Sequence, residues 1–225
     1  LITSSAASDV YKRQLQNFMN WKKPILTDSG GFQIWSLSKL RKILDDGIHF
    51  ISHLDGNSYK LTPEKSILIQ EKLNSTISMV LDECTEYPAS YKRSKDSMNL
   101  SIGWAKRCKK KFKKRNGYGI FGIIQGGMYN DLRKFCYNEL EKINFDGYAL
   151  GGLSVGESHK EMINIVENTV KIINFNKPRY LMGVGRPVDI FESVERGVDM
   201  FDCVIPTRFG RNGRAFVKDG EINLR

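Results

Sequence analysis

The sequence contains few of the residues that build metal centres and disulfide frameworks. Four cysteines are spread over 225 residues without a C-x-x-C pair. This spacing argues against a disulfide framework and against a cysteine zinc site, and it favours a reducing, cytoplasmic compartment. His49 and His53 have H-x3-H spacing with Asp55 nearby. No third ligand accompanies them, so loop histidines explain the pair better than a metal site.

Long apolar runs are also missing. No stretch of about 18 uncharged apolar residues occurs, so no membrane-spanning helix is predicted. The N-terminal segment, residues 1–14, is polar and has neither an apolar core nor a small-residue cleavage pattern. It is therefore not a secretory signal. Because it joins poorly to the residues that follow, we expect a non-native or disordered leader there.

Positive charge exceeds negative charge. The chain has 35 Lys and Arg against 25 Asp and Glu, a formal net charge of +10. This balance favours a polyanionic partner such as nucleic acid, although a lysine-rich solvated surface would give the same sum. The basic run "KRCKKKFKKR" at 106–115 leaves the same two interpretations open: a solvated helix end, or a patch that contacts phosphates.

Short β-branched or apolar runs alternate with segments of helical periodicity. The runs are "PILTD" ending at Asp28, "TISMVLD" ending at Asp82, "GIFGIIQ" ending at Gln125, "DGYALGG" ending at Gly152, "RYLMGVG" ending at Gly185, and "VDMFDCVIP" around Asp202. A helix capped by Thr62 with Pro63 at its first position is predicted between the first two, and further helices are predicted over 91–115, 129–142, 158–173 and 187–196. Such alternation is typical of parallel strands covered by helices.

Polar residues gather where these strands end. In a (β/α)8 barrel the carboxyl ends of all strands surround one mouth, which carries the site. An open doubly wound sheet would also gather ligands at strand ends, but mainly at one switch point between two strands. Six contributing strands favour the closed ring. We therefore predict an α/β fold of the (β/α)8 type, a TIM barrel that is incomplete in this chain.

Two of the strand-end carboxylates, Asp28 and Asp202, suit a reaction that divides nucleophilic attack and proton transfer between them. Asp82 and Gln125 offer acceptors and an amide that can read the edge of a flat heterocycle. The Gly151–Gly152 pair lets backbone approach such a ring closely. Phe32 and Met182 could sandwich the ring or belong to the core.

Seven motifs resemble those of one enzyme family. They are "DSGGFQIWSL" (28–37), "SHLDGNSYKLTPE" (52–64), "VLDECTEYPA" (80–89), "FGIIQGG" (121–127), "YALGGLSVGE" (148–157), "RYLMGVG" (179–185) and "FDCVIPTRFGRNGRAF" (201–216). In this order and spacing, across 21–216, they resemble the tRNA-guanine transglycosylases. The resemblance implies a (β/α)8 barrel and a pentosyltransferase, with residues 15–225 as part of its catalytic domain. Such an enzyme exchanges the wobble guanine of GUN-anticodon tRNAs (Asp, Asn, His and Tyr) for a base of queuosine biosynthesis.

The resemblance also implies residue roles. Asp202 matches the nucleophile that attacks ribose C1′, and Asp28 matches the proton-transfer residue. The base-binding set corresponds to Asp82, Cys84, Gln125, Gly151, Gly152 and Leu153, with Phe32 and Met182 as the stacking pair. The loop that engages the anticodon RNA corresponds to Thr207, Arg208, Gly210, Arg211 and Asn212.

Asp202 lies in an apolar strand that runs into an arginine-rich loop. We expect a buried carboxylate whose pKa is lowered by the neighbouring cations Arg208, Arg211 and Arg214, which would also hold the RNA. Cys84 and Val155 resemble the bacterial enzymes, which implies the small base 7-aminomethyl-7-deazaguanine (preQ1) as the incoming base.

The family's structural zinc site, a C-x-C-x2-C cluster with a histidine, has no counterpart before Arg225. We therefore expect an internal fragment of a longer, homodimeric enzyme whose zinc ligands are absent here. Two alternatives are considered: a non-catalytic tRNA-binding subunit of the same family, and a barrel hydrolase acting on sugars. The second explains Asp28 and Asp202 but gives no role to Asp82, Gln125 or the basic loop.

Overall fold

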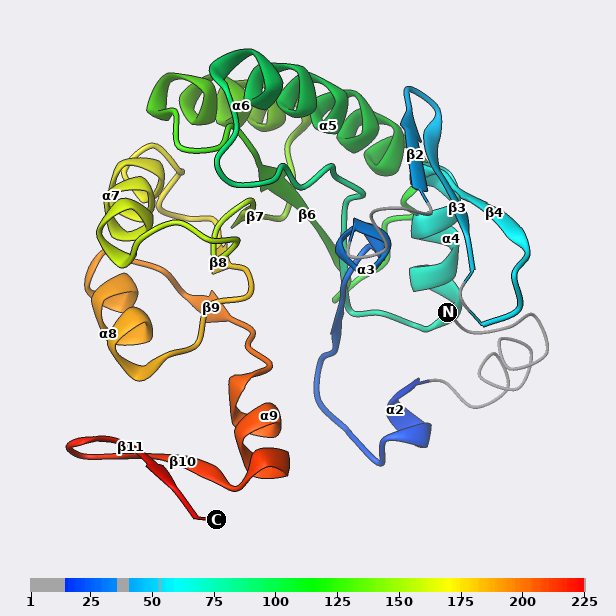
Figure 1. The fold of residues 1–225 in the computed structure, drawn as a ribbon. Helices are drawn as coiled ribbons and strands as arrows, with labels where there is room; N and C mark the ends of the chain where they lie inside the picture. Colours follow the sequence, from blue (N-terminus) through cyan, green and yellow to red (C-terminus); the bar gives the residue numbers. More distant parts are fainter. Residues whose placement is uncertain (1–14, 36–40, 53, 225) are drawn as a thin grey trace.

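The computed structural model describes residues 15–35, 41–52 and 54–224 (Figure 1). The leader predicted at 1–14, and His53 of the histidine pair, lie outside these residues. The helices are α2 (Leu15–Phe18), α3 (Gly31–Trp35), α4 (Pro63–Lys72), α5 (Tyr91–Lys111), α6 (Asn130–Ile143), α7 (His159–Val170), α8 (Pro187–Glu195) and α9 (Ile205–Asn212). In the described part of the chain, no helix is both long enough and apolar enough to cross a membrane.

Six parallel strands form the main sheet, in the order β1-β5-β6-β7-β8-β9. They are β1 (Leu26–Thr27), β5 (Ile77–Met79), β6 (Gly119–Ile124), β7 (Gly147–Leu150), β8 (Arg179–Leu181) and β9 (Met200–Phe201). The sheet curls into a half-barrel, and α5, α6, α7 and α8 follow one another along its outer side (Figure 1). This arrangement confirms the predicted incomplete (β/α) barrel.

The helix starts follow the chemistry of their caps. The Thr62 hydroxyl accepts a hydrogen bond from Lys65 N at 3.2 Å, with Pro63 at the first helical position, as predicted. Ser158 and Glu161 form a reciprocal capping box at the start of α7. Helix α5 ends at Lys111, short of the predicted residue 115, because Phe112 has extended backbone.

Two small antiparallel sheets were not predicted from the sequence. β2 (Arg41–Leu44), β3 (Gly47–Ile51) and β4 (Ser58–Leu61) form a meander, and β10 (Arg214–Val217) pairs with β11 (Gly220–Asn223) in a hairpin. The meander lies beside α4 and α5, and Trp104 of α5 donates its indole N–H to Asp45 O at 2.8 Å (Figure 1). Both sheets are additions to the half-barrel.

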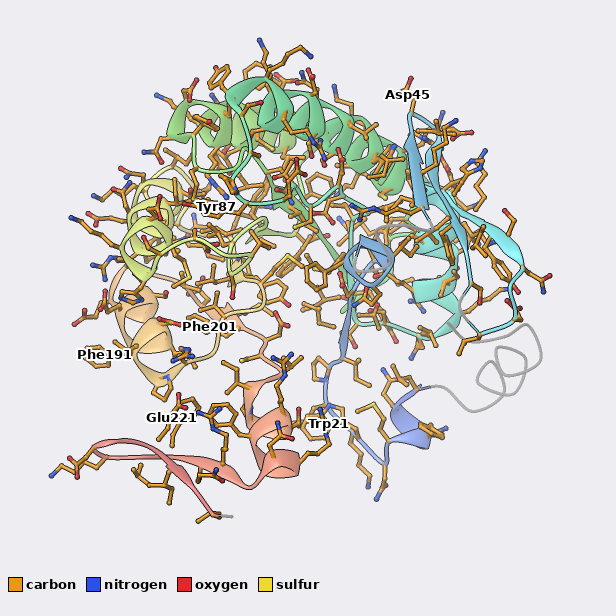
Figure 2. The ribbon with its side chains drawn as sticks, in the orientation of Figure 1. Trp21, Asp45, Tyr87, Phe191, Phe201 and Glu221 are labelled. Atoms are coloured by element: carbon orange, nitrogen blue, oxygen red, sulfur yellow. The ribbon has the colours of Figure 1, made fainter. Side chains whose placement is uncertain are left out.

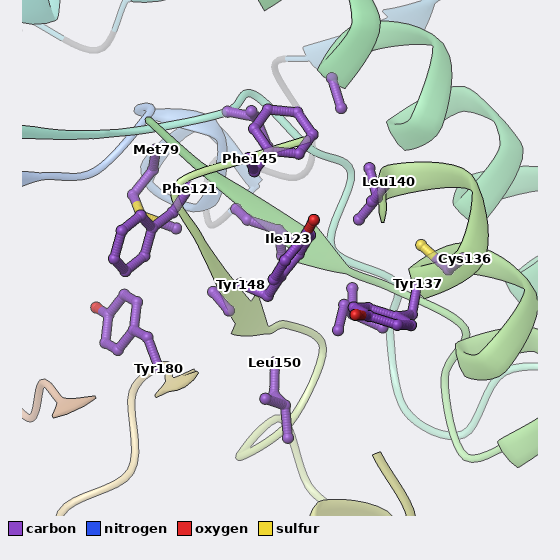
Figure 3. Close-up of a cluster of buried hydrophobic side chains, with 14 of the residues drawn as sticks. Met79, Phe121, Ile123, Cys136, Tyr137, Leu140, Phe145, Tyr148, Leu150 and Tyr180 are labelled. Carbon is purple, nitrogen blue, oxygen red and sulfur yellow. The ribbon is translucent and has the colours of Figure 1, made fainter. Parts of the chain in front are cut away.

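The core lies between the curled sheet and the outer helices. Figure 3 shows aromatic and aliphatic side chains from β6, β7 and α6 packed together in this layer. Two glycines make room for rings in adjacent segments: a Cβ on Gly122 would lie 2.8 Å from Phe145, and one on Gly147 would overlap the Phe121 ring. Close packing of this kind leaves no space for an added methyl group.

Gly147→Ala should therefore destabilise the protein by about 1–3 kcal/mol, because the new methyl group would displace the Phe121 ring from a packed core. Gly103 of α5 is the matched control: it is exposed, and no heavy atom lies within 4 Å of an added Cβ. Gly103→Ala should stabilise by roughly 0.5–1 kcal/mol. Urea unfolding of both variants checks the pair, and equal effects would contradict the packing assignment.

Candidate active site

Every strand of the main sheet is followed by one of the residues singled out from the sequence. Asp28, Gln125, Gly151, Met182 and Asp202 come directly after β1, β6, β7, β8 and β9, and Asp82 comes shortly after β5. The carboxyl ends of parallel strands share one edge of a sheet, so these residues lie around one mouth. The sequence placed them at strand ends, and the structure places them just beyond.

Asp202 is held by two donors. Its Oδ1 accepts hydrogen bonds from the Tyr180 hydroxyl at 2.6 Å and from Gly183 N at 2.7 Å. The expectation of a buried carboxylate beside arginines is wrong, because Asp202 is exposed and no salt bridge joins it to an arginine in the described segments. Neutral donors replace the predicted cations. Among described residues, none donates to Oδ2, so that oxygen is available to a ligand.

Asp28 interacts electrostatically with Asp82 and Tyr180. Its Oδ1 accepts from Ser29 N at 2.7 Å, and its Oδ2 accepts from Gln33 Nε2 at 3.1 Å. The negative charge of Asp28 acts on Asp82, and it also acts on the phenol of Tyr180 that supports Asp202. Burial and the bond to Asp202 raise the pKa of Tyr180 above its ordinary value, so this phenol stays a donor.

Asp82 and Gln125 bind each other across neighbouring strands. Gln125 Nε2 donates to Asp82 Oδ2 at 2.7 Å. Burial, with repulsion from Asp28 as a second cause, raises the pKa of the Asp82 carboxyl from 3.8 to about 7. Gln125 is 1% exposed, and its Oε1 has no hydrogen-bond partner among the described residues. A buried acceptor without a donor is costly and suits a site that a ligand completes.

The Gly151–Gly152 pair lies against the Gln125 amide. A Cβ added to Gly151 would lie 2.6 Å from Gln125 Nε2, and one added to Gly152 would lie 2.7 Å from Oε1. Gly152 also has φ +65°, which other residues rarely adopt. Leu153, the next residue, is buried. A bulkier side chain at either glycine would block this approach to the amide.

The remaining residues predicted to bind a base differ in their exposure. Phe32 on α3 is half exposed, Met182 packs partly against the core, and Cys84 is buried. Burial raises the pKa of the Cys84 thiol to about 12, so it is a neutral wall and not a nucleophile.

A cavity of about 180 Å³ adjoins this region. It is bordered by residues 85–89, by Gly127–Tyr129, and by Gly152 and Val155. The Tyr87 hydroxyl, on its rim, donates to Glu161 at 3.0 Å, which joins the 85–89 segment to the start of α7. The cavity therefore continues from the glycine pair toward α7.

The arginine-rich segment is a helix and not the loop expected from the sequence. Helix α9 begins beside Pro206 and ends at Gly213, which has φ +63°. It carries the predicted RNA-contacting residues Thr207, Arg208, Gly210, Arg211 and Asn212. Arg208 and Arg211 are exposed and form no ion pair with a described residue. They are free to meet an external anion.

Arg214 is engaged within the protein. Its guanidinium donates to Glu221 at 2.6 Å and lies 4.7 Å from the centre of the Phe209 ring. Glu221 also pairs with Arg186, before α8, at 3.5 Å. Glu221 belongs to the β10–β11 hairpin (Figure 2). This network joins the hairpin to α9 and to the β8–α8 connection. Arg214 therefore stabilises this arrangement, unlike Arg208 and Arg211, which are available to an external anion.

Two important residues escaped the sequence analysis. Tyr180 lies inside a buried strand, where an aromatic residue is ordinarily core, and only its spacing before Met182 and Gly183 marks it. Arg133, on α6, is fully buried beneath the glycine segments. Its only sequence signal was a position on the apolar side of an amphipathic helix.

The described residues contain no cluster of three or more His, Cys, Asp or Glu side chains that could hold a metal ion. His49 lies on β3, where its Nε2 is 3.7 Å from Asp46. These residues do not fit a structural zinc, and no step below depends on one.

The fold and the site together indicate the class of protein. A curled parallel sheet with three aspartates and an amide beyond its strand ends belongs to the α/β-barrel proteins that bind ligands at that rim. A family model described as queuine tRNA-ribosyltransferase matches residues 3–225. The chain belongs to the queuine tRNA-ribosyltransferase family, as its seven motifs indicated.

Curated relatives agree with this family. Queuine tRNA-ribosyltransferase of Rickettsia typhi is 56% identical over 225 residues, which are all of this chain and 62% of the relative. The protein of the same name from Rickettsia prowazekii is 54% identical over the same shares. That of Rickettsia massiliae is 56% identical over 211 residues, 94% of this chain and 58% of the relative. The chain thus spans about three fifths of their length.

Asp82→Asn should stabilise the protein in a pH-dependent way. The pKa of Asp82 is about 7 in the folded protein, against an ordinary value of 3.8. Between pH 3.8 and pH 7, Asp82 is therefore protonated in the folded protein and ionised in the unfolded chain. Its contribution to the free energy of unfolding therefore falls as pH rises through that window. The neutral asparagine avoids this loss. We expect a higher melting temperature than wild type at about pH 8 and little difference at about pH 4. Equal shifts at both values would contradict the assignment.

Proposed function

We propose that the protein is a tRNA base-exchange transferase that replaces the wobble guanine of GUN-anticodon tRNAs (Asp, Asn, His and Tyr) with preQ1 in queuosine biosynthesis. One observation carries the proposal: Asp202, with one oxygen held and the other open, lies on the same rim as the base-reading pair Asp82 and Gln125. Family membership supports it. The tRNA anticodon loop, guanine and preQ1 are the proposed partners, and a homodimer is the proposed state of the full-length enzyme.

The proposed first step forms a covalent bond to the RNA. Oδ2 of Asp202 attacks ribose C1′ while the bond from C1′ to guanine N9 breaks, and guanine leaves with the bonding electron pair and takes up a proton from water. The Tyr180 hydroxyl and Gly183 N–H fix Oδ1, which holds the carboxylate in one orientation for the attack.

The proposed second step reverses the first with a new base. Asp28 accepts a proton from the incoming base, whose nitrogen then attacks C1′ and releases the Asp202 carboxylate. Asp28 suits this role because its charge acts on both Asp82, in the proposed base site, and Tyr180, which supports the proposed nucleophile. Two aspartates in different surroundings thus take different tasks.

Base recognition is assigned to Asp82, Gln125 and the segment Gly151–Leu153. An ionised Asp82 can accept two N–H bonds from a guanine-like edge, while Gln125 and the Gly152 N–H can meet its carbonyl. Phe32 and Met182 are proposed to cover the ring faces, and Cys84 and Val155 to limit the pocket to a small substituent such as aminomethyl. The wobble base must leave the stacked loop to enter, which costs roughly a few kcal/mol.

Purified protein from the complete reading frame, incubated with tRNA and labelled guanine, tests the function directly. We expect label to enter tRNAs with GUN anticodons and to be displaced by preQ1. Binding of tRNA without incorporation would instead support the non-catalytic subunit.

Asp202→Asn should abolish the covalent protein–RNA adduct, because an amide is a far weaker nucleophile than a carboxylate. Binding of tRNA should change less than about threefold, since no phosphate contact is removed. Denaturing gels after trapping measure the adduct, and filter binding measures affinity. An adduct of wild-type yield in this variant would refute the nucleophile assignment.

Arg208→Ala with Arg211→Ala should weaken tRNA binding and reduce its salt dependence. Each lost phosphate contact lowers the slope of log affinity against log salt by about 0.7–0.9. The charge-matched control is Lys110→Ala with Lys114→Ala, two exposed lysines of the basic run at the end of α5. An unchanged control identifies that run as a solvated helix end, whereas equal losses in both double variants would contradict a specific role for α9.

A further inference from the structure

Arg133 is a buried cation without a buried anion. It lies on α6 with its side chain 0% exposed, and no salt bridge reaches it from any part of the chain that the structure describes. Burial lowers the pKa of this guanidinium to about 10. Burying a charge costs free energy, and an apolar residue would avoid that cost. A buried arginine therefore indicates that its hydrogen bonds have a role that an apolar residue could not fill.

The guanidinium instead binds three backbone carbonyls. Nε donates to Gly127 O at 2.8 Å, Nη1 to Ile124 O at 3.4 Å and Nη2 to Gly151 O at 2.9 Å. These oxygens belong to the end of β6, to the glycine turn after it, and to the residue that follows β7. One planar fork therefore ties together both segments that flank the Gln125 amide.

The contact to Gly151 O fixes the direction of the next N–H. In a planar trans peptide the C=O and N–H point in opposite directions. Because the Gly151 carbonyl points at Arg133, the Gly152 N–H points away from it, and this N–H donates to no other described residue. It is an unused donor beside the Gln125 amide.

Arg133 also holds the peptide that leads into Gln125, because its Nη1 donates to Ile124 O at 3.4 Å. Gly152 borders both groups: a Cβ placed there would lie 2.7 Å from Gln125 Oε1 and 4.0 Å from Arg133 Nη2. The Gln125 side chain is held from its other side, where Nε2 donates to Asp82 Oδ2 at 2.7 Å. Cys136, also on α6, accepts from Gln125 N at 3.4 Å and holds the backbone of the same residue.

We propose that Arg133 is a positioning residue for base recognition: from beneath the site it sets the direction of the Gly152 N–H and holds the backbone that carries Gln125, and so determines which edge of a purine-like base is accepted. The proposal rests on the base-exchange function given above and adds a residue that does not touch the substrate. A purely structural arginine would support stability alone.

Arg133→Met and Arg133→Lys test this in the protein expressed from its complete reading frame. We expect Arg133→Met to raise KM for guanine by at least about tenfold while KM for tRNA stays within about twofold, because only the base-reading donors lose their orientation. Arg133→Lys should recover part of the loss, since an ammonium can serve one or two of the three carbonyls. Calorimetric titration with free guanine reports base binding without turnover.

Arg179→Met is the matched control. Arg179 is also buried, at 7% exposure, and donates from Nη1 to a backbone carbonyl, Gly197 O, at 2.9 Å, but it lies at the amino end of β8, away from the rim. It should lower the melting temperature and leave KM for guanine unchanged.

The outcomes separate the two claims. A wild-type protein that incorporates no guanine defeats the proposed function. With an active wild type, an unchanged guanine KM in Arg133→Met, or an equal rise in Arg179→Met, overturns the role of Arg133. If Arg133→Met does not fold, Arg133→Lys decides: a guanine KM and a calorimetric affinity equal to wild type overturn the proposal.

Discussion

The space beside Gly147 is filled by the Phe121 ring, and this contact fixes how β7 lies against β6. The two strands pair with Phe121 opposite Gly147 and Ile124 opposite Leu150. That register brings the next residues, Gln125 and Gly151, side by side at the rim. Recognition of a base would thus depend on a backbone spacing set inside the core, far from any ligand.

The acidic groups of the rim differ in their burial and in their hydrogen bonds. Asp82 is pushed toward its neutral form by burial and by the charge of Asp28. Asp202 stays exposed and takes two donors on a single oxygen. The Gln125 amide nitrogen donates to Asp82, while its oxygen finds no partner in the described part of the chain. The rim therefore satisfies some of its polar groups internally and leaves others available to a ligand.

Local sequence predicted most of the frame, because strand–helix alternation and the residues that follow strands are local features. What it missed depends on the surroundings. Tyr180 lies in an apolar strand and looks like a core residue. The function of its hydroxyl becomes visible only in the fold, where it donates to Asp202. Arginine is ordinarily exposed, so the burial of Arg133 needed the fold. Helix α9 looked like a loop because Gly210 and Asn212 are weak helix formers, yet its proline start and Gly213 end permit it. Of the three arginines expected beside Asp202, Arg214 is engaged by a different acid, Glu221.

Glu161 makes two separate sets of hydrogen bonds at the start of α7. It closes the capping box with Ser158, and it receives the hydroxyl of Tyr87 from the segment that borders the 180 Å³ cavity. Outward movement of that segment would break only the bond from Tyr87 to Oε1, because the capping box uses Oε2. The cavity can therefore widen on this side while the first turn of α7 keeps its cap.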